Sequence, residues 1–181
     1  MTGAKHSALK REASLPVSNG MKKKSRVVAV SGGFDPLHIG HVRMFKKARS
    51  LGDKLVVILN NDNWLRAKKG YAFMPEKERA ELLLALPFVD EVYITKHPKN
   101  PRDMSVCDAL KKVRPGIFCN GGDRKGAKDI PEAVVCKELG IKMVFRVGGG
   151  KVQSSSWLVG AAHGVIGKTG AARLNGGRDR T

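Results

Sequence analysis

The segment from Ser31 to His41 constrains the fold of this 181-residue chain more than any other. It reads Ser-Gly-Gly-Phe-Asp-Pro-Leu-His-Ile-Gly-His and directly follows the apolar run Val27 to Val30. Such a run predicts a buried strand, and the two glycines predict a turn in which main-chain N–H groups approach an anion closely. His38 and His41 are three residues apart, so both fall on one face of the helix expected next. The segment therefore predicts a strand–turn–helix unit that handles phosphate.

Apolar segments alternate with helical patterns along the chain, and this alternation predicts parallel strands joined by right-handed crossovers. The expected strands are Arg26–Ser31, Lys54–Asn60, Glu91–Thr95, Gly116–Asn120 and Lys142–Val147. The expected helices are Ile39–Leu51, Pro75–Leu86, Asp103–Val113, Pro131–Leu139 and one that begins near Ser155. Gly52 and Gly140 stand where helix ends favour glycine. The predicted fold class is α/β: a single Rossmann-like, doubly wound domain with a five-stranded parallel sheet, whose ligands bind beyond the carboxyl ends of the strands.

The chain is strongly basic, with 34 Lys and Arg against 16 Asp and Glu. Seven of these basic residues lie within residues 1–26 and four within residues 165–181, and both segments are poor in large apolar groups. This composition predicts a disordered basic N-terminal arm over 1–25, a folded domain over 26–164 and a basic flexible C-terminal tail over 165–181. Solvated tails account for the charge, and nucleic-acid binding through them stays open as an alternative.

No apolar run is long enough to span a bilayer, and the N-terminus lacks the apolar stretch of a signal peptide. The three cysteines, Cys107, Cys119 and Cys136, have no close metal-type spacing. We therefore expect a cytoplasmic protein with buried, reduced thiols and no membrane partner. No cluster of acidic residues predicts a metal site.

The tetrad His38-Ile-Gly-His41 resembles the His-x-Gly-His motif of the cytidylyltransferase-like nucleotidyltransferase superfamily. Within it the chain is similar to glycerol-3-phosphate cytidylyltransferases and to the adenylyltransferase domain that makes ADP-heptose. Other segments match that family in order and spacing: Leu51 to Val57, Lys69-Gly70, Glu78-Arg79, Val89 to Val92, Gly121 to Asp123 and Ser154 to Ser156. The resemblance covers about residues 26–160 and thus identifies 26–164 as a nucleotidyltransferase domain.

The resemblance implies nucleotidyl transfer. A phosphate oxygen of a small acceptor, a sugar or polyol phosphate, attacks the α-phosphorus of ATP or CTP, and pyrophosphate leaves. Placement and charge stabilisation dominate such a reaction. The implied partners are the nucleoside triphosphate and the phosphorylated substrate, and the family also suggests a homodimer. Mg²⁺ is expected on the oxygens of the triphosphate rather than in a cage of side chains.

Three residues are predicted to be catalytic by this resemblance. His38 and His41 would stabilise the charge that develops at the α-phosphorus, without acting as nucleophiles. Lys69 would close over the β- and γ-phosphates from a mobile loop. Spacing alone does not decide which of Arg66, Lys68 and Lys69 reaches the phosphates.

Further residues are predicted to bind the nucleotide. Gly33 and Phe34 would present backbone N–H groups to the phosphates. Asp35 would either cap the helix that carries the histidines or orient substrate or metal. Arg79 would fork onto phosphate oxygens, unless it only pairs with a glutamate on the surface of its helix.

The remaining predicted nucleotide-binding residues are Gly122, Asp123, Ser154, Ser155 and Ser156. Gly122 lets a base or ribose approach, and Asp123 would contact it. The three serines would offer hydroxyls and helix-end N–H groups to the β- or γ-phosphate.

Several alternatives stay open. Glycerol-phosphate cytidylyltransferases carry an arginine shortly before the serine turn, and no arginine stands in register here, which favours adenylyl transfer; Arg146 and Lys151 are the nearest basic residues. Gly-Gly-Phe-Asp-Pro also resembles nicotinate-mononucleotide adenylyltransferases. The alternatives are therefore an FAD- or NAD-forming adenylyltransferase, and a non-catalytic nucleotide- or nucleic-acid-binding module on the same fold. Trp64 follows the second strand and would either pack or stack on substrate.

Overall fold

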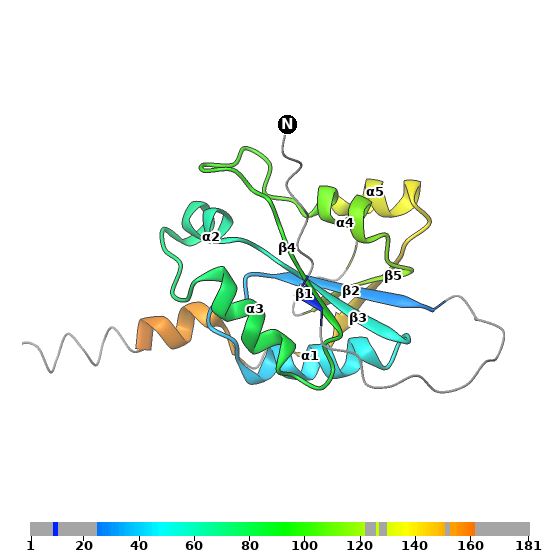
Figure 1. Cartoon of the computed structure of the whole chain (residues 1–181), viewed down its shortest axis with the longest axis horizontal. Coiled ribbons are helices and arrows are strands. Elements are labelled where there is room, and N and C mark those ends of the chain that lie inside the picture. Colours follow the sequence, from blue (N-terminus) through cyan, green and yellow to red (C-terminus); the bar gives the residue numbers. More distant parts are fainter. Residues whose placement is uncertain (1–8, 11–24, 122–125, 127–129, 151–152, 162–181) are drawn as a thin grey trace, which may run out of the picture.

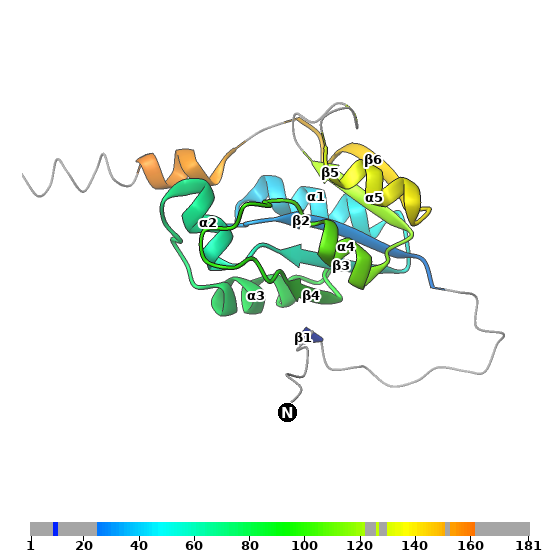
Figure 2. The same cartoon turned by 90° about the horizontal axis from the view of Figure 1, so that it is seen from above.

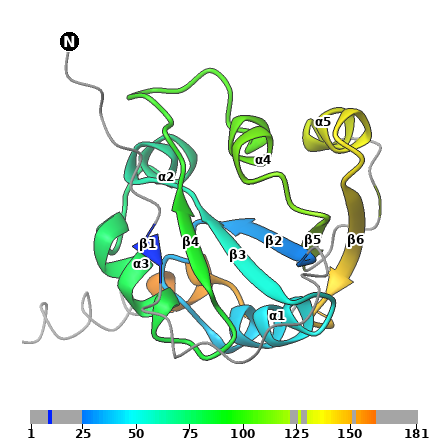
Figure 3. The same ribbon diagram turned by 45° about the vertical axis from the view of Figure 1, so that its right-hand side comes forward.

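The structure, a computed structural model, describes residues 9–10, 25–121, 126, 130–150 and 153–161. Figure 1 shows the whole chain. Within the described residues a six-stranded sheet has the order β1–β4–β3–β2–β5–β6 (Figure 3). Its strands are β1 (Leu9–Lys10), β2 (Val27–Gly32), β3 (Lys54–Leu59), β4 (Glu91–Ile94), β5 (Ile117–Gly121) and β6 (Lys142–Val147). Strands β2 to β6 are parallel, so the predicted five-stranded parallel sheet is confirmed.

Helices lie on both faces of this sheet, as Figure 3 shows. One face carries α1 (Ile39–Arg49) and α3 (Glu76–Leu84), and the other carries α4 (Cys107–Val113) and α5 (Glu132–Glu138). The helix α2 (Asp62–Lys69) follows the carboxyl end of β3, and residues 155–161 form a helix at the same end of the sheet (Figure 2). No helix in the described part of the chain is long and apolar enough to cross a bilayer.

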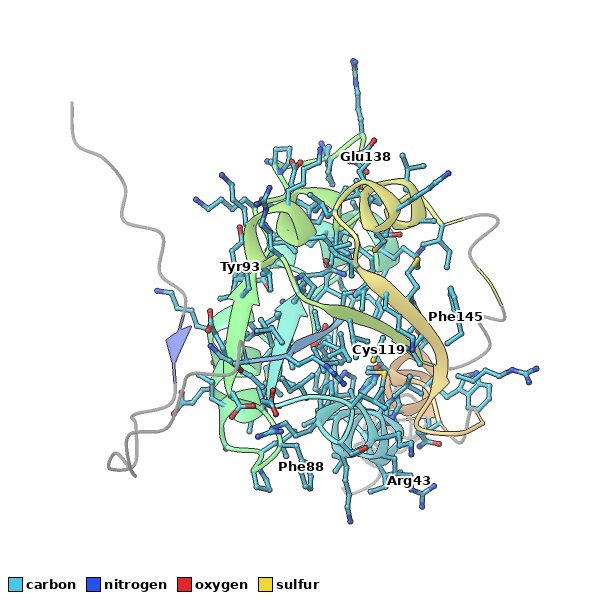
Figure 4. All side chains as sticks on the ribbon, turned by 90° about the vertical axis from the view of Figure 1, so that its right-hand side faces the viewer. Arg43, Phe88, Tyr93, Cys119, Glu138 and Phe145 are labelled. Carbon is cyan, nitrogen blue, oxygen red and sulfur yellow. The ribbon has the colours of Figure 1, made fainter. Side chains whose placement is uncertain are left out.

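The core forms two apolar clusters because strand side chains alternate between the faces of the sheet. Val28 and Val30 of β2 belong to the cluster beneath α1 and α3, whereas Ala29 belongs to the cluster beneath α4 and α5. The central strand β3 is buried from Leu55 to Leu59, as expected for a parallel strand covered on both faces. Cys119 of β5 lies in the interior between the helical layers (Figure 4).

The helix α2 was not predicted from the sequence, which indicates only a mobile loop at Lys69-Gly70. Its first turn is capped by Asn61, whose side chain accepts a hydrogen bond from the backbone N–H of Trp64 at 3.0 Å. It ends at Gly70, which has a left-handed φ of 84°. Lys69 is therefore the last residue of a helix, and the prediction that a loop carries it is wrong. The helix escapes prediction because Leu65 is its only buried residue.

Two further details differ from expectation. β1 pairs antiparallel with β4 and adds a short strand to the edge of the sheet. The helix α1 ends at Arg49, so Gly52 is not its cap. Gly52 instead allows close packing, because a Cβ there would lie 2.5 Å from the carbonyl oxygen of Arg26. Gly140 does follow its helix with a left-handed φ of 67°.

Candidate active site

A cleft of about 620 Å³ opens beyond the carboxyl ends of β2, β5 and β6. We call it the nucleotide cleft. Predicted site residues from three distant segments line it: Phe34, His38, His41, Lys69, Ser154, Ser155 and Ser156. The topology brings them together because the carboxyl ends of parallel strands meet at one edge of the sheet.

The two histidines of the cleft form the first turn of α1. His38 is the N-cap, and its Nδ1 accepts a hydrogen bond from the N–H of Gly40 at 3.1 Å. The N–H of His38 in turn donates to Nδ1 of His41 at 3.3 Å, which completes a capping box. A backbone N–H can only donate, so both Nδ1 atoms carry no proton. Each neutral ring therefore holds its proton on Nε2, which is free of the capping bonds and can donate to a ligand.

Burial and mutual repulsion keep these rings neutral. Burial lowers the pKa of His41 to about 3, and nearby His38 and Lys69 also lower it. Burial, followed by the charge of Lys69, likewise lowers the pKa of His38. The rings stack with their centroids 3.7 Å apart, so a proton on one opposes a proton on the other. Near neutral pH the pair offers N–H donors without a net charge.

Phe34 fixes the position of the His41 ring. Its ring is 5% exposed and meets His41 edge-on at 4.9 Å between centroids. Gly32 makes room for it, since a Cβ on Gly32 would lie 2.8 Å from the Phe34 ring. Gly33 packs elsewhere: a Cβ there would lie 2.7 Å from Leu65 of α2. The proposed phosphate contacts of the Gly33 and Phe34 N–H groups stay a prediction.

Lys69 is the one of the three candidate basic residues that lines the cleft. Its Nζ donates to the carbonyl oxygen of Asp35 at 3.0 Å, and burial lowers its pKa although Asp35 opposes that shift. Arg66 instead lies 4.0 Å from Asp62, and Nζ of Lys68 lies 5.8 Å from the centre of the Trp64 ring. Both of these side chains belong to exposed residues of α2.

Asp35 does not cap α1, and its role in orienting substrate or metal stays a prediction. It is fully buried, and its two carboxylate oxygens accept the backbone N–H groups of Phe73 at 2.7 Å and Met74 at 2.9 Å. His38, not Asp35, caps α1. The carboxylate therefore ties the segment before α3 to the turn after β2, and both oxygens are engaged in that task.

Arg79 is also a structural residue, so the predictions of a phosphate contact and of a surface ion pair are corrected. Its side chain is 1% exposed. Nε donates to Met74 O at 2.9 Å, and Nη2 donates to Oδ1 of Asp62 at 2.7 Å. Nη1 donates to Gly33 O at 2.6 Å and to Asn60 O at 2.9 Å. The guanidinium thus joins the turn after β2 to the end of β3 and the start of α2.

The serine turn also lines the cleft. Ser154 Oγ accepts the N–H of Trp157 at 3.2 Å, as a helix cap does. Ser155 Oγ donates to the carbonyl oxygen of Pro36 at 2.9 Å and so links residues 119 positions apart. Ser156 lines the cleft beside them. Gly122 and Asp123 lie outside the described residues.

One wall of the cleft was not predicted from the sequence. Gly148 has a φ of 94°, and a Cβ on it would lie 2.7 Å from Cα of Met44 in α1. The chain after β6 therefore passes closely over α1, which only glycine allows. The run Gly148-Gly-Gly150 is the sequence signal that could have predicted this wall.

In the described part of the chain, no group of three or more His, Cys, Asp or Glu side chains could hold a metal.

This chain is similar in sequence to a known family and to several of its members. A model of the family described as cytidylyltransferase-like matches residues 29–141. FAD synthase of Pyrococcus horikoshii is 40% identical over 106 residues, which cover 58% of this chain and 68% of that protein. Bifunctional protein HldE of Streptomyces coelicolor is 40% identical over 121 residues, 66% of this chain and 25% of that protein.

A solved structure is similar as well. The lipopolysaccharide core biosynthesis protein from Thermoplasma volcanium is 29% identical with a TM-score of 0.54, covering 68% of this chain and 96% of that one. The chain thus spans about two thirds of the length of the archaeal FAD synthases and about a quarter of HldE. The matched segment contains the strand–turn–helix unit and both histidines. The chain belongs to the cytidylyltransferase-like family of nucleotidyltransferases.

Proposed function

We propose that this protein is an enzyme that transfers a nucleoside monophosphate from ATP or CTP to a small phosphorylated acceptor and releases pyrophosphate. One observation carries the proposal: the capping box of α1 leaves two neutral imidazoles with their protons on Nε2, in a cleft that Lys69 and the serine turn also line. Preorganised donors of this kind stabilise charge that develops on a reacting phosphate.

In this proposal, different residues of the cleft bind different phosphates of the triphosphate. Lys69 and the serines at 154–156 hold the β- and γ-phosphates, and His38 and His41 donate to oxygens on the α-phosphorus. An oxygen of the acceptor phosphate forms a bond to the α-phosphorus. The bond from that phosphorus to the oxygen bridging to the β-phosphorus breaks, and its electron pair leaves with pyrophosphate. No proton has to move through the histidines.

Mg²⁺ would enter with the triphosphate as part of the substrate. Asp35, the buried carboxylate nearest the histidines in sequence, has both oxygens bonded to backbone N–H groups. The metal would therefore be held mainly by phosphate oxygens, where it neutralises charge on the leaving group.

The similar proteins suggest two classes of acceptor to test. FAD synthases make FAD, which contains an adenylyl group joined to a flavin phosphate, so ATP with FMN is one pair to test. The likeness to HldE and to the lipopolysaccharide core biosynthesis protein supports a sugar phosphate as the other. The homodimer and nucleic-acid binding by the basic tails stay predictions.

The test measures pyrophosphate released by the purified full-length chain with Mg²⁺. ATP and CTP are each paired with FMN, nicotinate mononucleotide, glycerol 3-phosphate and a set of sugar phosphates, and the product mass is determined. One pair should give a joined product and an equal amount of pyrophosphate. Release with no pair, while ATP or CTP still binds, would assign the chain to the non-catalytic alternative.

A further inference from the structure

A second, smaller cavity of about 190 Å³ adjoins the nucleotide cleft. The two cavities share Ser31, Gly32 and Gly121, at the carboxyl ends of β2 and β5. We call the smaller one the inner chamber; its other walls include Asn60, Trp64, Met104, Asn120 and Glu132. The proposed reaction does not use any of these five side chains.

The inner chamber lies on the face of the sheet opposite α1. Asn60 is two residues beyond Ile58 and Asn120 is two residues beyond Phe118, and both apolar residues belong to the cluster beneath α4 and α5. Strand alternation directs the two asparagines to that same face. β3 and β5 flank β2, so the asparagines are separated by about 10 Å between strand axes. They face the chamber from either side of the end of β2.

Each of these two buried amides has one atom without a hydrogen-bond partner in the described part of the chain. Asn60 is 4% exposed and Asn120 is 6% exposed. Within the described residues, Oδ1 of Asn60 and Nδ2 of Asn120 have no hydrogen-bond partner. The neighbouring Asn61 shows the usual condition, since its Oδ1 accepts from Trp64 N and its Nδ2 donates to His97 O. Buried polar atoms normally have partners, so one free acceptor and one free donor indicate that a ligand completes them.

The charge in the chamber determines which part of a ligand fits. Glu132 is its only charged side chain among the described residues, and Oε1 of Glu132 accepts the N–H of Val106 at 3.0 Å. Trp64 forms another wall, and its indole is fixed by a bond from Nε1 to Met104 O at 2.8 Å. A phosphate would be repelled by the carboxylate, whereas the nucleotide cleft has Lys69 and the two imidazoles. A phosphorylated acceptor is therefore oriented with its phosphate in the cleft and a neutral part in the chamber.

We propose that the inner chamber is the acceptor subsite and that it binds the hydroxyl-bearing carbons of a polyol phosphate. Hydroxyls fit because each one donates and accepts: one donates to Asn60 Oδ1, and another accepts from Asn120 Nδ2. This chemistry is shared by sugar phosphates, glycerol 3-phosphate and the ribityl phosphate of FMN. The inference rests on the proposed nucleotidyl transfer and specifies its acceptor.

The experiment compares Asn60→Leu, Asn120→Leu and the wild type, with the acceptor that releases most pyrophosphate among FMN, glycerol 3-phosphate and glucose 1-phosphate. Each asparagine variant should raise KM for the acceptor about tenfold. KM for the nucleotide should stay within about twofold. The matched control is Asn63→Leu, because Asn63 lies on α2 outside both cavities and its amide donates to His97 O at 3.0 Å. It should leave both KM values unchanged.

Selectivity gives a second measurement. Propyl phosphate has the phosphate of glycerol 3-phosphate and none of its hydroxyls. The wild type should prefer glycerol 3-phosphate, and both asparagine variants should lose most of that preference in kcat/KM. An unchanged acceptor KM, or an equal rise in KM for nucleotide and acceptor, overturns the subsite. So does a wild type that does not distinguish the two probes.

Melting temperature separates this inference from failure of the enzyme itself. If the amides serve a ligand, Asn60→Leu and Asn120→Leu should melt no lower than the wild type without ligand, whereas a structural role would lower the melting temperature. FMN, glycerol 3-phosphate or glucose 1-phosphate should raise the melting temperature of the wild type and not of the variants. A protein that releases no pyrophosphate but shows this pattern contradicts only the proposed reaction. Absence of any shift with all three probes overturns the subsite.

Discussion

Two groups of buried polar side chains lie at the carboxyl edge of the sheet, and they differ in how completely they are bonded. Around Arg79 and Asp35, three guanidinium nitrogens and two carboxylate oxygens are all engaged. In the inner chamber, Asn60 and Asn120 each keep a buried atom without a partner among the described residues. A fully bonded buried network favours one conformation, and a partly bonded one is favoured only when something else completes it. The first group holds the site in shape, and the second is available to a ligand.

The largest expected effect is the loss of stability caused by Arg79→Leu. It leaves Asp62 and three carbonyl oxygens without their donor, so the free energy of unfolding should fall by about 3–5 kcal/mol. Urea unfolding measures it. Arg66→Leu is the matched control, because Arg66 is exposed and lies 4.0 Å from the same Asp62; it should change stability by less than about 0.5 kcal/mol. Equal losses of unfolding free energy in the two variants would mean that the buried bonds of Arg79 do not stabilise the fold.

The next effect concerns catalysis with the fold preserved. His38→Asn keeps an oxygen that caps α1 but removes Nε2, so kcat should fall about 100- to 1000-fold, while stability changes by less than about 1 kcal/mol. Pyrophosphate release and urea unfolding measure the two quantities. His97→Asn is the control, because the His97 ring lies outside the nucleotide cleft; this variant should keep kcat near the wild-type value. A kcat within threefold of wild type in His38→Asn would remove His38 from the reaction.

A smaller effect follows from the pH dependence of stability. In the folded protein the pKa of His41 is about 3, below the usual 6.5, so the unfolded chain takes up the proton first as pH falls. Stability should therefore decrease below about pH 6.5 and continue to decrease toward pH 3. Between pH 7 and pH 5 the wild type should lose about 1–2 kcal/mol more than His41→Asn. Parallel losses in urea unfolding at the two pH values would show that His41 is not buried as described.

The smallest effect is expected for Asn60→Leu in the absence of ligand. Leucine has a similar size and removes an unbonded atom, so the free energy of unfolding should change by less than about 0.5 kcal/mol or rise. The adjacent Asn61→Leu should lose about 2 kcal/mol, because it removes the α2 cap and a bond to His97 O. A comparable loss in both variants would erase the distinction between bonded and unbonded groups.

The parallel sheet and the histidine pair could be predicted because their signals are local. The runs at 27–30 and 54–59 are apolar over several consecutive residues, as buried parallel strands are. The histidine pair was expected on one face of a helix, but His38 is the N-cap of α1 and lies before its first residue, so the capping box, and not the helix period, brings the two rings together. The edges of these elements differed by one to four residues in most cases, since helix ends depend on capping contacts.

The roles of Arg79 and Asp35 could not be predicted, because they depend on atoms from distant segments. Arg79 has glutamates as sequence neighbours, which is typical of a surface residue. Its side chain is nevertheless buried, and it donates to carbonyl oxygens of Gly33, Asn60 and Met74. Likewise, nothing in the sequence around Asn120 shows that Nδ2 of its amide has no partner among the described residues. Short helices such as α2 are missed for a related reason: a single buried residue gives no apolar period.

The capping box of α1 also restricts how the site could change its chemistry. Because Nδ1 of each imidazole is committed to a main-chain N–H, neither ring can shuttle a proton from one nitrogen to the other without loosening the first helical turn. Acid–base reactions that depend on such a relay are therefore closed to this pair. A reaction that needs Nε2 of either ring as a base would therefore have to give up one of the capping hydrogen bonds.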